Sequence, residues 1–276
     1  SELPHCLFLD SAVHHERLGR YSFLAADPFD TLQVPADGTD GLSLLEGKLA
    51  GFRAETIPGL PPFQGGAAGL FGYDLHRSLE RIPMSRFDEF HAPALSLGFY
   101  DVVVAFDHFR RQAWLISHGF PESDERARCE RAEARLAQFR ERIECGRHAD
   151  GGKRSWHVAA ADGVSLQNLA PQYHVQGPDG LTSNFSKQEY WEAVQRVIDY
   201  IRAGDVFQVN LSQRLLFPAS DDSGTLYLRL RERNPAPFAA FFDTGRFQVV
   251  SASPERFLSV RERVVETRPI KGTRRR

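Results

Sequence analysis

The sequence predicts a mixed α+β fold, and three observations support this prediction. β-forming apolar runs at 95–106 and 112–118, separated by a short polar stretch, indicate antiparallel strands. Ser186 and Glu189 form a capping box at the start of an amphipathic helix that ends at Gly204. With 276 residues, of which 42% are apolar, the chain can bury a sizeable core in one large or two smaller domains.

The first part of the chain mixes both kinds of element. Strand-like runs occur at 6–9, 21–25 and 31–34, and a helix is predicted at 41–51. The glycine-rich stretch 65–74 matches neither G-x-G-x-x-G nor a Walker pattern, so we expect close packing of the backbone rather than a phosphate cradle.

The runs at 95–106 and 112–118 are predicted to pair as a hairpin. Residues 122–145 combine strong helix formers with interspersed charges and a narrow apolar stripe, which is typical of a solvated helix.

A loss of periodicity divides the chain. Residues 146–183 collect Gly, Asp, Gln and Pro and are predicted to be a linker. We therefore expect an N-terminal domain at 1–145 and the first part of a second domain at 184–276. The second domain is predicted to continue from the capped helix into a strand at 206–217 and a helix at 226–233.

Composition disfavours several classes of protein. The formal net charge of −2 argues against nucleic acid as the main partner, and Arg274–Arg276 is too short for a basic tract. Cys6, Cys129 and Cys145 share no metal-ligand spacing and suit reduced thiols in a cytoplasm. No run of 18 apolar residues and no secretory segment is present, so we expect a soluble cytoplasmic protein without a membrane partner.

Lys271 is the most informative residue of the chain. It follows the alternating run 263–268 and Pro269, and Gly272 comes directly after it, so it is placed between a strand end and a glycine turn. If the hairpin turn centres near Arg263, Glu255 lies almost opposite Lys271. An exposed cross-strand ion pair is the alternative interpretation, and a slip of one residue in register would separate the two side chains.

Several segments resemble those of the chorismate-utilising enzymes and occur in the same order. They are FLDSA at 8–12, GRYSFLAADP at 19–28, GDVFQVNLSQR at 204–214, NPAPFAAFF at 234–242, SASPERF at 251–257 and ETRPIKGT at 266–273. The resemblance implies an anthranilate-synthase-like fold, a two-sheet β-sandwich with flanking helices. Because family members continue past the lysine motif, it also implies that this chain is truncated on its C-terminal side and inactive as it stands.

Within this family, aminodeoxychorismate synthases carry lysine at the position of Lys271, whereas anthranilate synthases carry a small residue. The resemblance therefore implies amination of chorismate to 4-amino-4-deoxychorismate for p-aminobenzoate and folate biosynthesis. In the implied mechanism the lysine amine forms a covalent adduct with chorismate. Glu255 is expected to act as general acid or base, and Gly272 and Thr273 are expected to contact a substrate carboxylate.

The resemblance also implies a second site and further components. Positions matching those around a bound tryptophan in the family are Ser11, Arg20, Tyr21, Pro237, Phe238 and Ala239. The usual L-L-E-S pattern is altered here by Asp10, which leaves open a tryptophan site or simple core packing. Mg²⁺ is the implied cofactor, with ligands expected beyond residue 276, and a glutamine amidotransferase is the implied partner. The alternatives are an anthranilate synthase component or a non-catalytic tryptophan-binding or assembly module.

Overall fold

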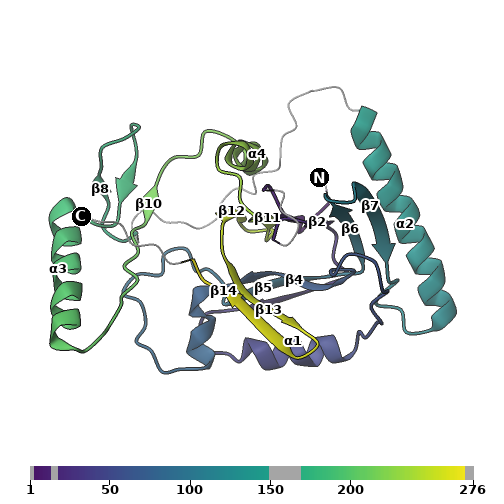
Figure 1. Cartoon of the computed structure of the whole chain (residues 1–276), viewed down its shortest axis with the longest axis horizontal. Helices are drawn as coiled ribbons and strands as arrows, with labels where there is room; N and C mark the ends of the chain where they lie inside the picture. The colour runs from purple at the N-terminus through teal and green to yellow at the C-terminus, as the bar shows by residue number, and fades with distance from the viewer. Residues whose placement is uncertain (1–2, 14–17, 149–168, 271–276) are drawn as a thin grey trace. The chain divides into compact units, whose positions relative to one another are not determined.

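The computed structural model describes residues 3–13, 18–148 and 169–270, which form two compact units (Figure 1). The first unit comprises the described residues up to Ile82, those from Ala92 to the end of the second α-helix, and those from Asp222 onward. The second comprises Pro83–His91 and the described residues that follow that helix up to Asp221. Helices and antiparallel sheets alternate irregularly along the chain, so the predicted α+β class is confirmed.

A six-stranded antiparallel sheet forms one layer of the first unit. Strand β1 lies inside this sheet, between β2 on one edge and β11 on the other, so residues from the two ends of the chain are neighbours. The strands, in spatial order, are β12 (Gln248–Ser253), β11 (Phe238–Asp243), β1 (Leu7–Asp10), β2 (Tyr21–Ala25), β6 (Val102–Asp107) and β7 (Gln112–Ser117).

A three-stranded antiparallel sheet forms the facing layer. It consists of β3 (Asp30–Val34), β5 (Leu95–Tyr100) and β4 (Gly66–Phe71). Leu7 and Phe242 of the large sheet belong to the same buried apolar cluster as Tyr100 of the small sheet. Because this core joins residues of both sheets, the layers pack face to face as a β-sandwich.

The predicted strand at 95–106 is wrong as a single element. It consists of β5 and β6, which lie in different sheets, and Asp101 is the junction between them. Asp101 is fully buried and its carboxylate lies 3.3 Å from Arg135. Apolar residues continue on both sides of this junction, and both strands are buried, which is why the pattern gave no sign of a break.

Close backbone packing explains the glycine-rich stretch, as the sequence predicts. Gly69 in β4 has a φ of 151°, and a Cβ added there would lie 2.3 Å from the carbonyl oxygen of Ser96 in β5. A side chain at this position would collide with the neighbouring strand.

Helices flank the sandwich (Figure 1). Helix α1 (Gly41–Ala50) and the 3₁₀ helix η1 (Tyr73–Ser78) come from the connections between strands. Helix α2 (Glu125–His148) follows β7 and is held by arginines, of which Arg128 donates to the carbonyl of His118 at 2.8 Å. Helix α4 (Ser223–Arg233) packs on the outer face of β11 and β12.

The second unit contains the capped helix. α3 (Lys187–Ala203) starts with the predicted capping box and ends at Gly204, which has a φ of 83°. A small sheet accompanies it, in the order β10 (Leu215–Leu216), β9 (Thr182–Ser183) and β8 (Tyr173–His174). The predicted strand at 206–217 is therefore wrong except for its last residues.

The compact units do not follow the predicted boundaries at 145 and 183. Strand β9 lies within the predicted linker, yet it pairs with β8 and β10 of the second unit. Residues from Asp222 onward join the first unit because β11 pairs with β1. Pairing between such distant strands leaves no local signal in the sequence.

The predicted C-terminal hairpin is confirmed. β13 (Arg256–Arg261) pairs with β14 (Val264–Arg268), and the two turn residues, Glu262 and Arg263, have φ values of 47° and 67°. Arg256 pairs with Arg268, whereas the pairs nearer the turn are displaced by one residue, which marks a β-bulge in β13.

Candidate functional site

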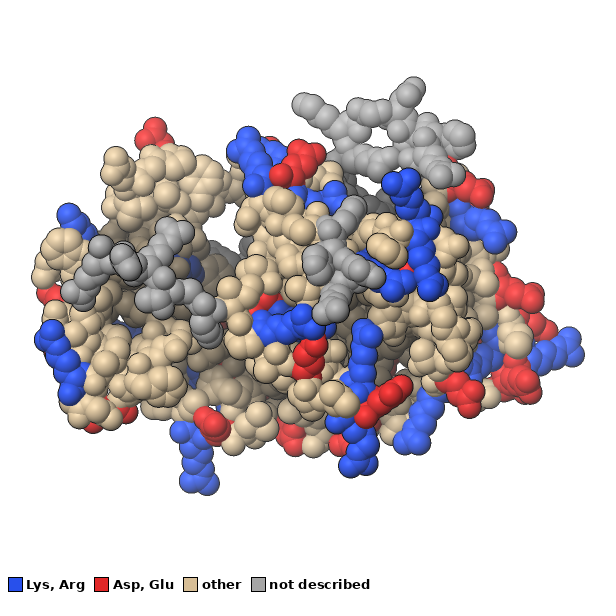
Figure 2. All heavy atoms as spheres, viewed as in Figure 1, with Lys and Arg blue, Asp and Glu red and all other residues tan. Residues whose placement is uncertain are grey.

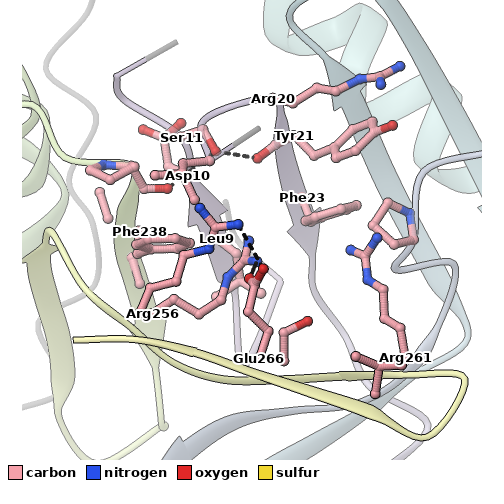
Figure 3. Close-up of a pocket in the computed structure, with 18 residues that line it drawn as sticks. Leu9, Asp10, Ser11, Arg20, Tyr21, Phe23, Phe238, Arg256, Arg261 and Glu266 are labelled. Carbon is pink, nitrogen blue, oxygen red and sulfur yellow. Dashed lines mark hydrogen bonds and ion pairs between the residues drawn. The ribbon is translucent and has the colours of Figure 1, made fainter. Parts of the chain in front are cut away.

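A cavity of about 650 Å³ opens on the inner face of the six-stranded sheet, beside the core of the sandwich (Figure 3). Strand alternation positions its wall. Leu7 of β1 is in the core, and Leu9 and Ser11, on the same face, line the cavity. Phe23 of β2 and Phe238 of β11 supply aromatic surface beside them.

All six residues predicted around tryptophan line this one cavity. They are Ser11, Arg20, Tyr21, Pro237, Phe238 and Ala239. The sequence places them in two groups that are far apart, and the pairing of β1 with both β2 and β11 brings the groups together.

Ser11 fixes the wall of the cavity rather than presenting a free hydroxyl to it. Its hydroxyl donates to the carbonyl of Tyr21 at 2.6 Å, and its backbone N–H donates to Ser22 Oγ at 3.0 Å (Figure 3). Arg20 is likewise committed, because its Nη2 lies 2.6 Å from the carboxylate of Asp107. These two residues therefore hold the ends of β1 and β2 in place.

Asp10 lines the cavity wall, but its carboxylate is engaged by groups of the outer face. One oxygen accepts from the Tyr227 hydroxyl at 2.9 Å and from Arg231 Nε of α4. The other accepts from Ser22 Oγ at 2.9 Å. The hydrogen bond between Arg231 and the Asp10 carboxylate is the main reason that the pKa of Arg231 is raised above its usual value.

The hairpin β13–β14 supplies a charged wall that sequence reasoning missed. Arg256 Nη1 lies 2.8 Å from one carboxylate oxygen of Glu266, and Arg268 Nη2 lies 2.7 Å from the other (Figure 3). Hydrogen bonding from Arg268, and then from Arg256, lowers the pKa of Glu266 to about 2. Arg261 also lines the cavity.

A period of two could have identified part of this wall. Val264, Glu266 and Arg268 alternate along β14 and therefore share one face. On β13 the bulge lies between Arg256 and Ser259, and it carries Arg256 onto the same side as Arg261. The position of a bulge cannot be seen in the alternation alone.

The predicted catalytic segment is described only in part. Lys271, Gly272 and Thr273 lie outside the described residues. The opposition of Lys271 to Glu255 and the substrate contacts of Gly272 and Thr273 therefore stay predictions. Glu255 is half-buried, immediately before β13, and its backbone N–H donates to Ser253 Oγ at 3.3 Å.

The described residues provide neither a cluster of metal ligands nor a helix suited to a membrane span. They contain no group of three or more His, Cys, Asp or Glu side chains that could hold a metal ion. The Mg²⁺ that the resemblance implies was not expected to bind among these residues, so it stays a prediction. None of the described helices is both long and apolar enough to cross a membrane.

On the face seen in Figure 2, basic and acidic side chains are interspersed.

Comparison with known proteins finds similarity to one enzyme family over almost the whole chain. The family model for chorismate binding enzymes matches residues 5–276. Anthranilate synthase component 1 of Thermus thermophilus is 34% identical, over 98% of this chain and 54% of that protein. Aminodeoxychorismate synthase component 1 of Bacillus subtilis is 31% identical, over 99% of this chain and 55% of that protein.

The fold is also found in a solved structure. Anthranilate synthase component I from Streptococcus pneumoniae aligns with a TM-score of 0.65 and 24% identity, over 92% of this chain and 54% of that one. The expected anthranilate-synthase-like fold is thereby confirmed. The chain spans about half the length of the curated relatives it matches. Since the family model covers nearly every residue, the chain belongs to the chorismate-binding enzyme family.

Proposed function

We propose that this protein takes part in the amination of chorismate to 4-amino-4-deoxychorismate, on the path to p-aminobenzoate and folate. The observation that carries the proposal is the position of Lys271, three residues after β14 ends at Arg268. A lysine amine at this point of a chorismate-binding enzyme is available as a covalent nucleophile.

The reaction needs such a nucleophile because ammonia must replace a hydroxyl at the same ring carbon. The amine of Lys271 adds at C2 of chorismate, the two conjugated ring double bonds move from C1=C2 and C5=C6 to C1=C6 and C4=C5, and the C4 hydroxyl leaves. Ammonia then adds at C4, both double bonds return to their first positions, and the lysine amine leaves from C2. Each displacement runs through the conjugated diene, and the lysine is regenerated at the end.

Glu255 is the residue that we assign to proton transfer. This assignment is supported by the pairing of Arg256, the residue after Glu255, with Arg268, which comes three residues before Lys271 in the sequence. As the acid it protonates the departing hydroxyl, so that water leaves. As the base it accepts a proton from the incoming amine, and a positioned group of this kind contributes about 10²–10⁴-fold in rate. Gly272 and Thr273 would donate hydrogen bonds to a substrate carboxylate.

The test is covalent capture of the substrate. The full-length gene product is incubated with chorismate and Mg²⁺ but without ammonia, and its intact mass is measured, followed by proteolytic mapping. We expect an adduct on Lys271, which the Lys271→Ala variant loses and the control variant Lys187→Ala, on α3, retains. Full synthesis of aminodeoxychorismate by Lys271→Ala would refute the role.

A glutamine amidotransferase is the partner that we propose as the source of ammonia. The relatives are named as component 1 of their synthases, which supports a second component here. Mg²⁺ bound to a substrate carboxylate would neutralise its charge.

Anthranilate synthesis is the second candidate. It is favoured by the 34% identity to the Thermus thermophilus protein and opposed by Lys271. The product formed from chorismate and ammonia distinguishes the two, since anthranilate is aromatic and aminodeoxychorismate is not.

The cavity beside the sandwich core is proposed to bind tryptophan, as a structural or a regulatory ligand. Its aromatic wall and its lining by all six predicted residues support this role. Tryptophan binding without any turnover of chorismate by the full-length protein would instead favour a non-catalytic binding or assembly module.

A further inference from the structure

We propose that Glu266 is a positioning residue for the proposed amination. Its carboxylate holds Arg256 and Arg268 together and so sets the register at the open end of the β13–β14 hairpin. Glu255 comes directly before this end in the sequence, and Lys271 follows it by three residues. The inference rests on the proposed function, because Glu266 touches no reacting atom and acts only through the placement of these two groups.

The register of the hairpin changes near its open end. Ser259 pairs with Glu266, and the next pair toward that end is Arg256 with Arg268. Two residues of β13 therefore face the single residue Thr267 of β14, which defines a bulge. Without the bulge, each pair beyond Ser259 would move by one residue and the side chains would exchange faces. The bulge thus decides how the ends of the two strands meet.

The bulged register places two like charges directly opposite each other, on Arg256 and Arg268. Cβ atoms of opposed residues are about 4.5–5.5 Å apart, and like charges there destabilise a strand pair. Glu266 offsets this repulsion, since one of its carboxylate oxygens lies 2.8 Å from Arg256 Nη1 and the other 2.7 Å from Arg268 Nη2 (Figure 3). The carboxylate keeps its charge near neutral pH, because hydrogen bonds from Arg268 and then Arg256 lower its pKa to about 2. The bulged register therefore depends on this one carboxylate.

The backbone alone holds the open end weakly. In the described part of the chain, β13 and β14 form a two-stranded sheet of their own, and such a hairpin is only marginally stable. One contact with the six-stranded sheet comes through Arg256, whose guanidinium carbon lies 5.2 Å from the centre of the Phe238 ring in β11. Because Arg256 both packs on Phe238 and bonds Glu266, the same carboxylate also connects the register of the hairpin to the large sheet.

A shift at this end would disturb the proposed chemistry without removing either reacting group. Reacting atoms must approach to about 3–3.5 Å, and a displacement of about 1 Å can cost about 10²-fold in rate. The side chain of Glu266 is 39% exposed, and exposed ion pairs add little to overall stability. Loss of its charge should therefore change the rate more than the folding.

The test measures how fast the covalent adduct forms at saturating chorismate. The full-length protein is mixed with chorismate and Mg²⁺ without ammonia, and its intact mass is followed in time. Glu266→Gln should slow adduct formation by about 10–100-fold, while the chorismate concentration that gives half the maximal rate changes little. The control Glu262→Gln removes the same charge at the hairpin turn and should leave the rate unchanged.

A double variant distinguishes positioning from proton transfer. In Arg256→Gln, Glu266→Gln one of the two opposed arginines is gone, so the repulsion that shifts the register is absent. We expect this variant to form the adduct about 5–10-fold faster than Glu266→Gln alone. A Glu266 that transferred a proton would not be rescued by the loss of an arginine, so a double variant as slow as Glu266→Gln would overturn the inference.

The remaining outcomes separate this inference from the proposed function. If the unmodified protein and Glu266→Gln form the adduct at the same rate, the proposed function stands and the positioning role is overturned. If Glu266→Gln lowers only the amount of folded protein, with the rate per folded molecule unchanged, Glu266 is structural and the inference is again overturned. If the unmodified protein forms no adduct, the lysine chemistry is refuted and the positioning role with it.

Discussion

The hydroxyl of Tyr227 donates a 2.9 Å hydrogen bond to the carboxylate of Asp10, although the two residues are 217 positions apart in the chain. Tyr227 is on α4 and Asp10 is at the end of β1, so this bond and the neighbouring one from Arg231 attach the helix to the sheet. Asp10 is also the residue that alters the family's usual sequence pattern. Because its carboxylate is buried, substituting it tests how much these bonds contribute to stability.

Replacing Asp10 by asparagine should destabilise the protein. The change removes the charge that faces Arg231 and leaves Tyr227 and Ser22 competing for one acceptor. We expect a loss of about 2–4 kcal/mol in the free energy of unfolding, below the usual cost of breaking a buried pair because Arg231 is 36% exposed. Denaturant titration measures this loss. The exposed control Asp179→Asn should stay within about 0.5 kcal/mol of the unmodified protein, and equal losses in the two variants would contradict the expectation.

Gly69→Ala should be among the most damaging single-methyl changes in the chain. The new Cβ would lie 2.3 Å from the backbone oxygen of Ser96, in a conformation that alanine rarely adopts. We expect a loss above about 3 kcal/mol, or failure to obtain folded protein. Gly47→Ala in α1 is the matched comparison, because a Cβ there meets nothing within 4 Å. It should stabilise the helix by about 0.5–1 kcal/mol, and similar melting temperatures for the two variants would be inconsistent with the packing of β4 on β5.

The ion pair of Arg20 with Asp107 should make stability fall in acid. The Arg20 hydrogen bond, together with the backbone N–H groups of Phe109 and Arg110, holds the pKa of Asp107 below its usual value of 3.8. Since the folded-state pKa is lowered, the contribution is complete above pH 3.8 and is lost as the pH falls through the folded-state value.

The measurement is the difference in unfolding free energy between the unmodified protein and Asp107→Asn. It should be about 2–3 kcal/mol at neutral pH and should shrink toward zero in strong acid. A difference that stays constant from neutral pH to about pH 2 would show that the charge of Asp107 contributes nothing.

The three cysteines should react at different rates. Cys129 and Cys145 are exposed, whereas Cys6 is buried and its pKa is raised to about 11 by desolvation. A thiol reagent at pH 8 should therefore label Cys129 and Cys145 at once and Cys6 only after denaturant is added. Mass spectrometry of the labelled peptides gives the order, and early labelling of Cys6 would mean that the segment just before β1 becomes accessible in the native state.

Local signals in the sequence predicted the elements that local interactions determine. The capping box of Ser186 and Glu189, the helix at 41–51 and the hairpin with its turn near Arg263 depend on residues a few positions apart, and all three are found. The run 206–217 has β-forming residues, but only Leu215–Leu216 pairs with a neighbouring strand, so propensity alone misled there.

The candidate site could be predicted only in part. Motif resemblance identified residues near Ser11 and Phe238, and the cavity joins them, yet no periodicity shows that β1 lies beside β11. The arginines of β13 were missed because a bulge changes which of them face the cavity. Position 271 was singled out by its motif and remains the residue on which the proposed chemistry depends.

The position of β1 inside the large sheet affects how the protein folds while it is being translated. One edge of β1 is covered by β2 soon after both are translated, but the other waits for residues 239–242 of β11. Until then, a growing chain or a fragment that ends before β11 presents an unpaired strand edge, which is a template for aggregation. Closing the sheet also requires contacts of high sequence separation, which slow folding. We therefore expect that shortening the chain before β11 yields insoluble protein, and that chaperone demand during synthesis is greatest just before this strand emerges.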